Sequence, residues 1–255
     1  MMKKKLSLVL KIIFWITPFF FWFGWELILV YPRALGLLII ASLVLLVPVV
    51  YEAVGRRFQG PFVFIFISAG LLLSSFYLFI SLLSVTWVVQ LAWPLLVWYL
   101  YRYFLAVKQM AITGDTKKWA EISLFGSLVT IFFVSASLFG LQAFLSLSPW
   151  PLLAIFAVIS FASMWSLAFS QGWNRPQDFW LWPLSSLMIS EIALMFTLLP
   201  LNYLIAGILC ALAYYSVLNF IRLYLNNNLS ARKIKNYALF TAISLIIILL
   251  TARWL

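Results

Sequence analysis

Residues 120–144 read AEISLFGSLVTIFFVSASLFGLQAF, and this stretch decides the fold class of the chain. It holds one charged residue, Glu121, close to its start, and its apolar residues do not alternate with polar ones. A helix crosses a hydrocarbon core about 30 Å thick with about 20 apolar residues, whereas a barrel strand alternates over about ten. The stretch therefore predicts a membrane-spanning helix.

The rest of the chain repeats this pattern. Its 255 residues are 66% hydrophobic and 9% charged, far below the charged fraction of about 25% in soluble domains. We expect an all-α, polytopic integral membrane helical bundle of about nine transmembrane helices, forming one transmembrane domain over residues 1–255. Eight spans is the alternative, because the last apolar run is short. The predicted spans are 12–31, 34–51, 61–83, 85–104, 120–144, 151–170, 179–199, 202–225 and 237–254.

The charges are unequal, with 17 Lys and Arg against 6 Asp and Glu, a net charge of +11. Cytoplasmic loops of membrane proteins carry the excess of Lys and Arg. With a cytoplasmic N-terminus, nine spans place all cations on that side except Arg33 and Arg253, which predicts an outside C-terminus. The compact loops and the charge bias are typical of a bacterial cytoplasmic (inner) membrane protein. The cytoplasmic cations are Lys3, Lys4, Lys5, Lys11, Arg56, Arg57, Arg102, Lys108, Lys117, Lys118, Arg175, Arg222, Arg232, Lys233 and Lys235.

The basic loops also suggest partners. Arg232, Lys233 and Lys235 could hold anionic lipid headgroups, at about 1 kcal/mol for each cation, although membrane orientation alone accounts for them. Nucleic-acid binding is not expected, because the cations are spread over several segments and no domain gathers them. The predicted partners are the lipid bilayer and a further membrane protein.

The tryptophans are predicted to act mainly as anchors. Amphipathic rings concentrate at the headgroup level of a bilayer. Six of the thirteen tryptophans lie at predicted span ends: Trp119, Trp150, Trp173, Trp180, Trp182 and Trp254. Trp165 lies deeper and either packs in the bundle or lines a cavity.

Small residues four apart predict close helix packing within the bundle. Such spacing lets two helix backbones approach each other in a membrane. The pairs are Gly70 with Ser74, Gly126 with Thr130, and Ala136 with Gly140.

Several enzyme classes are excluded by missing residue types. The chain has no histidine and one cysteine, Cys210, which rules out a Ser-His-Asp triad, a His-based zinc site and an intrachain disulfide. No pair of acidic residues at helical spacing lies inside a span. We expect no catalytic residue, metal site or cofactor, and a non-enzymatic role is favoured. Asp115 is expected to cap the span that begins after it.

Ionisable residues inside spans are the best functional candidates, because burying a charge at the bilayer centre costs about 2.5–3.5 kcal/mol. Glu191 lies near the middle of its predicted span. The same span carries Ser186, Ser190, Ala193 and Thr197 at spacings of 4, 3 and 4, a small polar face that we expect to point into the bundle with Glu191 beside it. A structural, protonated carboxyl is as consistent with this pattern as a proton-relay or substrate-binding role.

A second group of polar residues lies in the outer halves of the predicted spans. Glu26 and Arg33 are seven residues apart and could form an ion pair, although a glutamate that simply reaches headgroup water is the simpler interpretation. We expect an outward-facing polar pocket between the first, fourth, fifth, seventh and eighth spans. Its substrate- or proton-binding candidates are Glu191, Glu26, Arg33, Gln90, Gln142 and Ser190.

Three functions remain open. The first is a small transporter or permease-like protein with Glu191 as a proton- or cation-linked carboxyl. The second is a non-catalytic membrane subunit or assembly factor of a larger complex, which the short loops favour. The third, an enzyme acting on a lipid, comes last because catalytic residues are missing.

Overall fold

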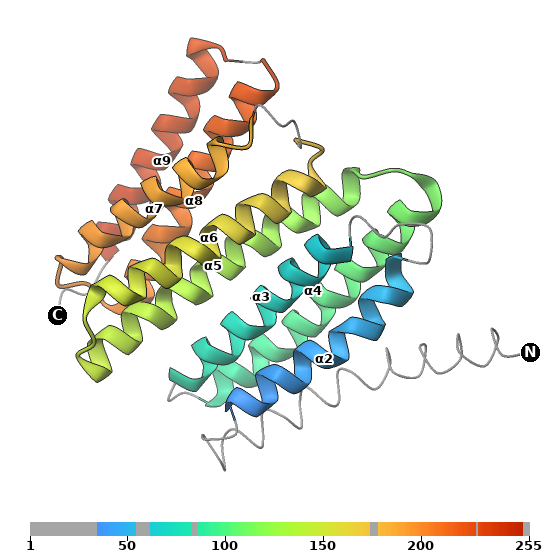
Figure 1. Ribbon diagram of the computed structural model, residues 1–255. Helices are drawn as coiled ribbons and strands as arrows, with labels where there is room; N and C mark the ends of the chain where they lie inside the picture. The colour runs from blue at the N-terminus through green and yellow to red at the C-terminus, as the bar shows by residue number, and fades with distance from the viewer. Residues whose placement is uncertain (1–34, 55–61, 83–85, 174–177, 228, 252–255) are drawn as a thin grey trace, which may run out of the picture.

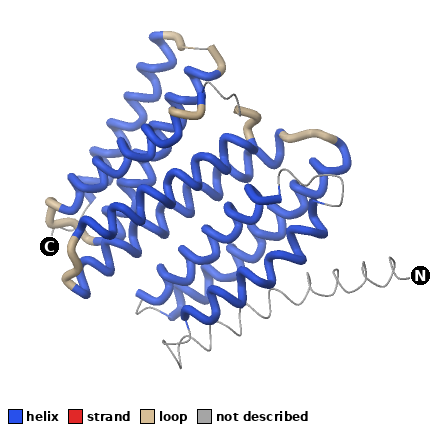
Figure 2. The backbone as a smooth tube through the Cα atoms, in the orientation of Figure 1, coloured by secondary structure: helices blue, strands red, loops and turns tan. Residues whose placement is uncertain are grey.

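The computed structural model describes residues 35–54, 62–82, 86–173, 178–227 and 229–251. Over these ranges the chain forms helices joined by short turns, with no β-strand (Figure 2). The prediction of an all-helical bundle is confirmed at this level. The helices, labelled as in Figure 1, are α2 (Leu35–Val54), α3 (Phe62–Leu82), α4 (Thr86–Thr113), α5 (Lys117–Leu145), α6 (Pro149–Ser170), α7 (Leu181–Thr197), α8 (Tyr203–Leu225) and α9 (Ala231–Thr251).

Most helix ends lie within three residues of the predicted spans. The largest difference is in α4, which continues nine residues past the predicted end at residue 104. The continuation keeps Ala106, Val107 and Met110 buried, and it ends just before Gly114, whose φ of 75° requires a left-handed backbone. The predicted span over residues 12–31 lies outside the described residues.

Six of the described helices are long and apolar enough to cross a membrane: α2, α3, α5, α6, α8 and α9. The helix α7 is also apolar but has 17 residues, at the short end of the range for a membrane span. These helices identify an integral membrane protein with a lipid bilayer as its environment.

The helix α5 lies at the centre of the bundle and joins two hydrophobic clusters (Figure 1). The first cluster is built from α2, α3 and α4 together with Trp119 at the start of α5. The second contains residues of α5 to α8, among them Ile131 and Val134 of α5. Because α5 packs against helices on both sides, its side chains must leave room for a close neighbour on each side.

Small residues leave this room at the contact between α5 and α8. A methyl group added at Gly207 of α8 would lie 3.1 Å from the backbone nitrogen of Ala136 in α5, so the two backbones almost touch. A methyl group at Gly70 would lie 2.9 Å from the side chain of Leu43, so α3 and α2 are in contact there through a side chain. The predicted close approach of backbones is confirmed at Ala136, between α5 and α8.

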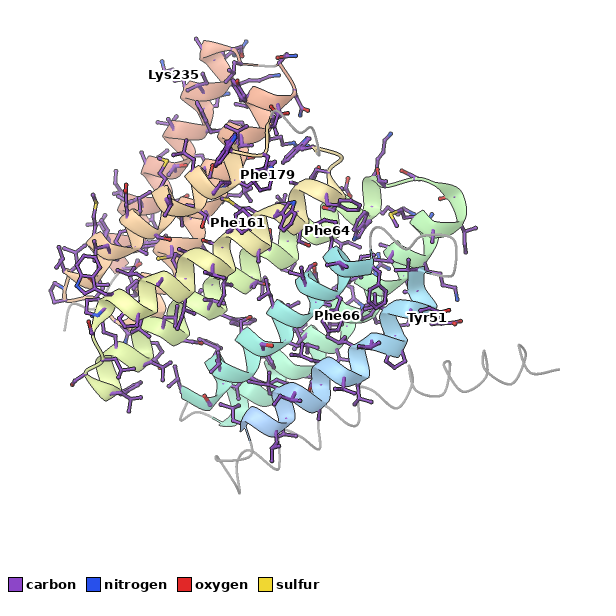
Figure 3. All side chains as sticks on the ribbon, in the orientation of Figure 1. Tyr51, Phe64, Phe66, Phe161, Phe179 and Lys235 are labelled. Atoms are coloured by element: carbon purple, nitrogen blue, oxygen red, sulfur yellow. The ribbon has the colours of Figure 1, made fainter. Side chains whose placement is uncertain are left out.

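Aromatic rings fill the space between α3, α6 and the segment before α7. The ring of Trp165 contacts Phe64 at 5.5 Å, Phe161 at 5.6 Å and Phe179 at 6.2 Å between centroids, and Figure 3 labels its three partners. Of the two interpretations of Trp165, packing within the bundle is therefore the observed one.

The last helix differs from the others. None of the residues of α9 is buried, although Ser216 of α8 and Thr241 of α9 are joined by a hydrogen bond of 2.9 Å. The helix α9 thus lies at the edge of the bundle and adds nothing to the two clusters.

Candidate functional site

The polar interior of the bundle is made almost entirely of hydroxyl groups. The buried polar side chains among the described residues are thirteen serines, one threonine and one asparagine, and none carries a charge. Most of these hydroxyls donate to a carbonyl of their own helix, as Ser127 does to Leu124 at 2.8 Å and Thr130 to Gly126 at 2.8 Å. Serine and threonine can be buried in this way without a partner from another helix.

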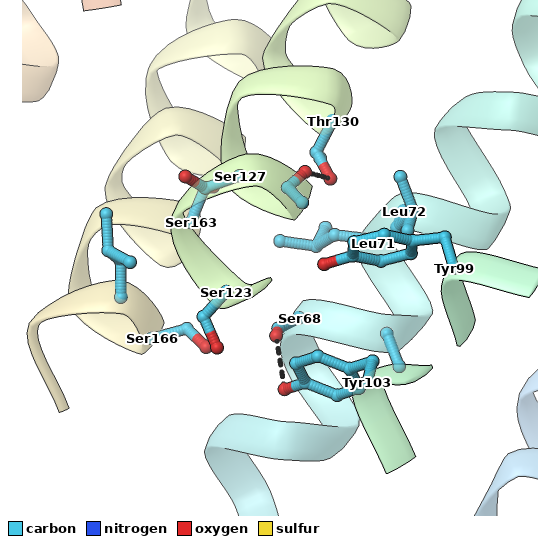
Figure 4. Close-up of a pocket in the computed structure, with 13 residues that line it drawn as sticks. Ser68, Leu71, Leu72, Tyr99, Tyr103, Ser123, Ser127, Thr130, Ser163 and Ser166 are labelled. Carbon is cyan, nitrogen blue, oxygen red and sulfur yellow. Dashed lines mark hydrogen bonds between the residues drawn. The ribbon is translucent and has the colours of Figure 1, made fainter. Parts of the chain in front are cut away.

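Hydroxyls from four helices converge on one cavity in the interior. The residues Ser123, Ser127 and Thr130 share one face of α5, since they are four and then three positions apart. Figure 4 shows this face opposite hydroxyls of α3, α4 and α6. The enclosed space is about 20 Å³, room for about one water molecule. The hydroxyl cavity, as we call it, is lined by the polar residues Ser68, Tyr99, Tyr103, Ser123, Ser127, Thr130, Ser163 and Ser166.

Hydrogen bonds across this cavity tie neighbouring helices together. The hydroxyls of Ser68 and Tyr103 lie 2.9 Å apart and join α3 to α4 (Figure 4). The Ser166 hydroxyl donates to the Phe64 carbonyl at 2.8 Å and joins α6 to α3. Tyr99 donates to the Ile122 carbonyl at 2.8 Å and joins α4 to α5. The cavity wall is therefore well defined on the α3, α4 and α6 sides.

Two buried polar groups at this site have no hydrogen-bond partner. They are the Ser123 hydroxyl and the indole nitrogen of Trp119, one helical turn before it on α5. Both side chains approach the Tyr103 hydroxyl, but neither reaches hydrogen-bond geometry with it or with any other group. Trp119 is 2% exposed and Ser123 is 8% exposed. Buried polar groups in native proteins are almost always paired, so these two are exceptions among the buried polar groups of the described residues.

Gly126 is required for the shape of this wall. A methyl group at that position would overlap the hydroxyl and ring of Tyr99. The glycine thus lets the Tyr99 side chain pass across α5 and reach the Ile122 carbonyl.

An apolar pocket adjoins the hydroxyl cavity on the other side of Tyr99. Its volume is about 180 Å³, and it lies between α3, α4 and α5. Leu72 and Tyr99 line both spaces, so their side chains form the partition between a polar and an apolar compartment. The apolar pocket is also lined by Phe76, Ala92, Leu95, Leu96, Phe125, Val129 and Phe133.

The predicted polar face of α7 points into the bundle, but Glu191 does not lie with it. Ser186, Ser190 and Ala193 are buried, and Ser190 donates to the Ser186 carbonyl at 2.8 Å. Glu191 is exposed on the outer face of the bundle. Glu191 flanks this interior face by one residue step, a rotation of about 100°, and that rotation turns its side chain out of the interface.

The other predicted site residues are separated from the hydroxyl cavity. Gln142 lines a second small pocket between α5, α6 and α7, together with Ser135 and Thr197. Glu26, Arg33 and the side chain of Gln90 lie outside the described residues. The outward-facing pocket therefore stays a prediction.

The anchor prediction for the tryptophans requires exposed rings, which some of them have and others do not. Trp150 and Trp180 are 68% and 76% exposed, as rings at a bilayer interface require. Trp119 and Trp182 are each 2% exposed, so the prediction is wrong for these two. Trp182 is covered by Trp173, which stacks on it at 6.3 Å between centroids. Trp254 lies outside the described residues.

The acidic residue at the start of α5 has the predicted structural role. The Asp115 carboxylate accepts a hydrogen bond from the Lys117 backbone N–H at 3.0 Å, which satisfies one free donor at the start of the helix. Among the described residues, no group of three or more His, Cys, Asp or Glu side chains is arranged to bind a metal ion.

The site residues predicted from the sequence are three charged residues, two glutamines and Ser190, and none of them lines the hydroxyl cavity as described. The signal was present in α5, where Ser123, Gly126, Ser127 and Thr130 follow one another on a single face. Comparison with protein-family models, with curated proteins and with solved structures found no match for this chain.

Proposed function

We propose that the protein is a small multi-pass transporter or permease-like protein that binds its solute in the hydroxyl cavity. The observation that supports this proposal is the Ser123 hydroxyl, which lines the cavity and has no hydrogen-bond partner, while the unpaired indole nitrogen of Trp119 lies one helical turn before it. A solute that accepts a hydrogen bond would pair the Ser123 hydroxyl. Glu191 faces away from this cavity, so we assign solute binding to the hydroxyls and not to the carboxyl.

The lining chemistry favours an uncharged solute. The cavity offers serine, threonine and tyrosine hydroxyls, and none of the described residues that line it is charged. A buried ion without an opposite charge would lose its hydration at a large cost. In this conformation the cavity has room for about one water molecule, so a larger solute would enter only when α3 to α6 move apart, as in alternating access.

Cysteine labelling tests this proposal without knowledge of the solute. Ser123→Cys places a thiol at the cavity, and Ser137→Cys places one on the same helix, where Ser137 is buried and bonded to the Phe133 carbonyl. The native Cys210 is fully buried and serves as the unreactive background. A transporter must open its solute site to water, whereas a structural hydroxyl need not be reached.

We expect a membrane-impermeant thiol reagent to label Ser123→Cys from at least one side of the membrane and to leave Ser137→Cys unlabelled. The exposed Ser146→Cys at the end of α5 controls for reagent activity. Absence of labelling at position 123 from both sides, with position 146 labelled, would refute a solute site in this cavity.

A second candidate function, a subunit or assembly factor of a larger membrane complex, is favoured by α9. This helix has no buried residue, so the surface that does not contact α8 is available to another membrane protein. Ending the chain after residue 229 should leave the fold intact and release a stoichiometric partner from the purified complex. An unchanged set of co-purified proteins would count against this function.

We also propose that nine spans cross a bacterial inner membrane with the N-terminus inside. In this orientation the first turns of α9 lie at the cytoplasmic surface, where the exposed Arg232, Lys233 and Lys235 meet anionic headgroups (Lys235 in Figure 3). Vesicles rich in phosphatidylglycerol should then stabilise the protein more than phosphatidylcholine vesicles do. Replacement of the three cations by glutamine should remove the difference, and a difference that persists would refute this contact.

A further inference from the structure

The exposed face of α7 carries a regular pattern. Leu184, Met188, Glu191, Met195 and Leu198 succeed one another at intervals of 4, 3, 4 and 3 residues. All five are exposed, the four apolar ones by 66%, 52%, 63% and 80% in chain order. An interval that averages 3.5 residues is that of a helix packed lengthwise against another helix. We call these five residues the α7 seam.

Glu191 makes this face unusual for one that meets only lipid. It lies ten residues after the start of α7 at Leu181 and six before its end at Thr197, about 15 Å along the helix. None of the described residues forms a hydrogen bond or ion pair with its carboxyl. A polar side chain in hydrocarbon is costly without a partner, and none of the described residues of the same chain supplies one at the depth of Glu191.

A second Glu191 carboxyl meets this requirement. A neutral carboxyl has one O–H donor and a carbonyl acceptor, so two of them can each donate to the other. Within the described residues no cation lies in the middle part of α7 or beside it. The polar chemistry of the seam is thus complementary to itself, and no opposite charge is required.

The membrane fixes the geometry of such a pair. Two copies of one chain cross the bilayer in the same direction, so a two-fold axis between them must be perpendicular to the membrane. Across a two-fold interface each residue patch meets its own copy. The two α7 helices would then lie parallel, with Glu191 opposite Glu191 and the Leu and Met residues of the seam opposite their copies.

We infer that the α7 seam is a self-association surface, through which two copies of this chain pair with their Glu191 carboxyls hydrogen-bonded to each other. A polar residue at one position of such a seam sets the register and the number of chains. The inference is independent of the hydroxyl cavity, and either can fail without the other.

Disulfide cross-linking of the full chain in its membrane tests the surface. Met188→Cys and Met195→Cys place thiols on the seam, while Val158→Cys of α6, 67% exposed, places one on another exposed helix face. The wild-type chain, whose one cysteine is buried, gives the background. On mild oxidation we expect the two seam variants to form a product of twice the 29.3 kDa chain, and the Val158 variant to stay monomeric.

Three outcomes would overturn the inference. These are no product in either seam variant, an equal yield at position 158, or a seam product whose mass shows a different protein attached. The last outcome would assign the seam to another membrane partner.

The role of the carboxyl is tested separately, by measuring dimerisation in liposomes over a series of lipid dilutions. Glu191→Gln keeps a donor and an acceptor in the same place, whereas Glu191→Leu leaves only the apolar seam. Because interhelical hydrogen bonds in membranes are modest, we expect association to weaken about three- to tenfold in the leucine variant and to be largely kept in the glutamine variant. Equal association of the leucine variant and the wild type would refute the carboxyl pair.

Discussion

Two serines near the hydroxyl cavity differ in how their hydroxyls are satisfied. Ser166 donates to the Phe64 carbonyl on another helix, whereas Ser123 has no partner. A buried polar group that lacks a partner loses about 1–3 kcal/mol relative to a satisfied one. The unliganded protein should therefore tolerate the loss of the Ser123 hydroxyl better than the loss of the Ser166 hydroxyl.

We predict that Ser123→Ala keeps or raises the free energy of unfolding of the purified protein, by up to about 1 kcal/mol, because it removes an unpaired polar group. Ser166→Ala should lower it by about 1 kcal/mol, since a bond between α6 and α3 is lost. Thermal unfolding of both variants in one detergent measures the contrast. Equal destabilisation would mean that Ser123 holds a tightly bound water or solute in the purified protein.

Ser123 is buried and Glu191 is exposed, and the sequence could not predict which of the two side chains faces the interior. In a soluble helix, polar residues mark the outer face, so the inner face can be read from the pattern. In a membrane both faces are apolar, and the pattern around Glu191 and Trp119 does not tell which side is inside. The polar face of α7 could be predicted because several small hydroxyl residues share it, whereas the orientation of a single carboxyl beside it could not.

The close approach of α5 and α8 depends on Gly207. Its position leaves no room for a side chain, since a methyl group there would meet both the side chain and the backbone of Ala136. Backbone cannot move aside as a flexible side chain does, so the whole helix would have to shift. Gly36 of α2 has no atom within 4 Å of the same added methyl group and provides the matched control.

We predict that Gly207→Ala lowers the free energy of unfolding by about 1–3 kcal/mol, the usual cost of overpacking. Gly36→Ala should be neutral or stabilising by up to about 1 kcal/mol, because alanine favours a helix more than glycine does. Both are measured as shifts of the thermal midpoint in the same detergent. A Gly207 variant as stable as the Gly36 variant would show that α5 and α8 can separate without cost.

Helix bounds were the most predictable feature at the scale of elements. The run at 120–144 became α5 at Lys117–Leu145 because apolar length sets a membrane helix. The end of α4 was less predictable, because the predicted span ends at residue 104 although the helix continues to Thr113. Charges end the membrane-embedded part of a helix, but they do not end the helix itself.

For the molecule as a whole, the distribution of Lys and Arg predicts the orientation of the chain in the membrane. Nine spans and a cytoplasmic N-terminus put 15 of 17 cations on one side. We predict that a reporter fused after Leu255 lies outside the cytoplasm, as assayed with an enzyme that is active only there. A cytoplasmic reporter would remove α9 from the spans and leave eight.

The fold class of the whole molecule followed from composition, but the site did not. Apolar length and charge asymmetry are properties of single segments, and they need no knowledge of neighbours. The hydroxyl cavity exists only where four helices meet, and Ser68, Tyr103 and Ser166 are far apart in the chain. Such a site depends on helix rotation, which a uniformly apolar sequence specifies weakly.

The hydroxyls that bond to their own helices affect how the bundle can move. Ser127, Thr130 and Ser137 of α5 each donate to a carbonyl three or four residues earlier. When a neighbouring helix slides past, these bonds travel with α5 and none has to break. A small shift of a neighbouring helix along this part of α5 would therefore cost none of these three hydrogen bonds.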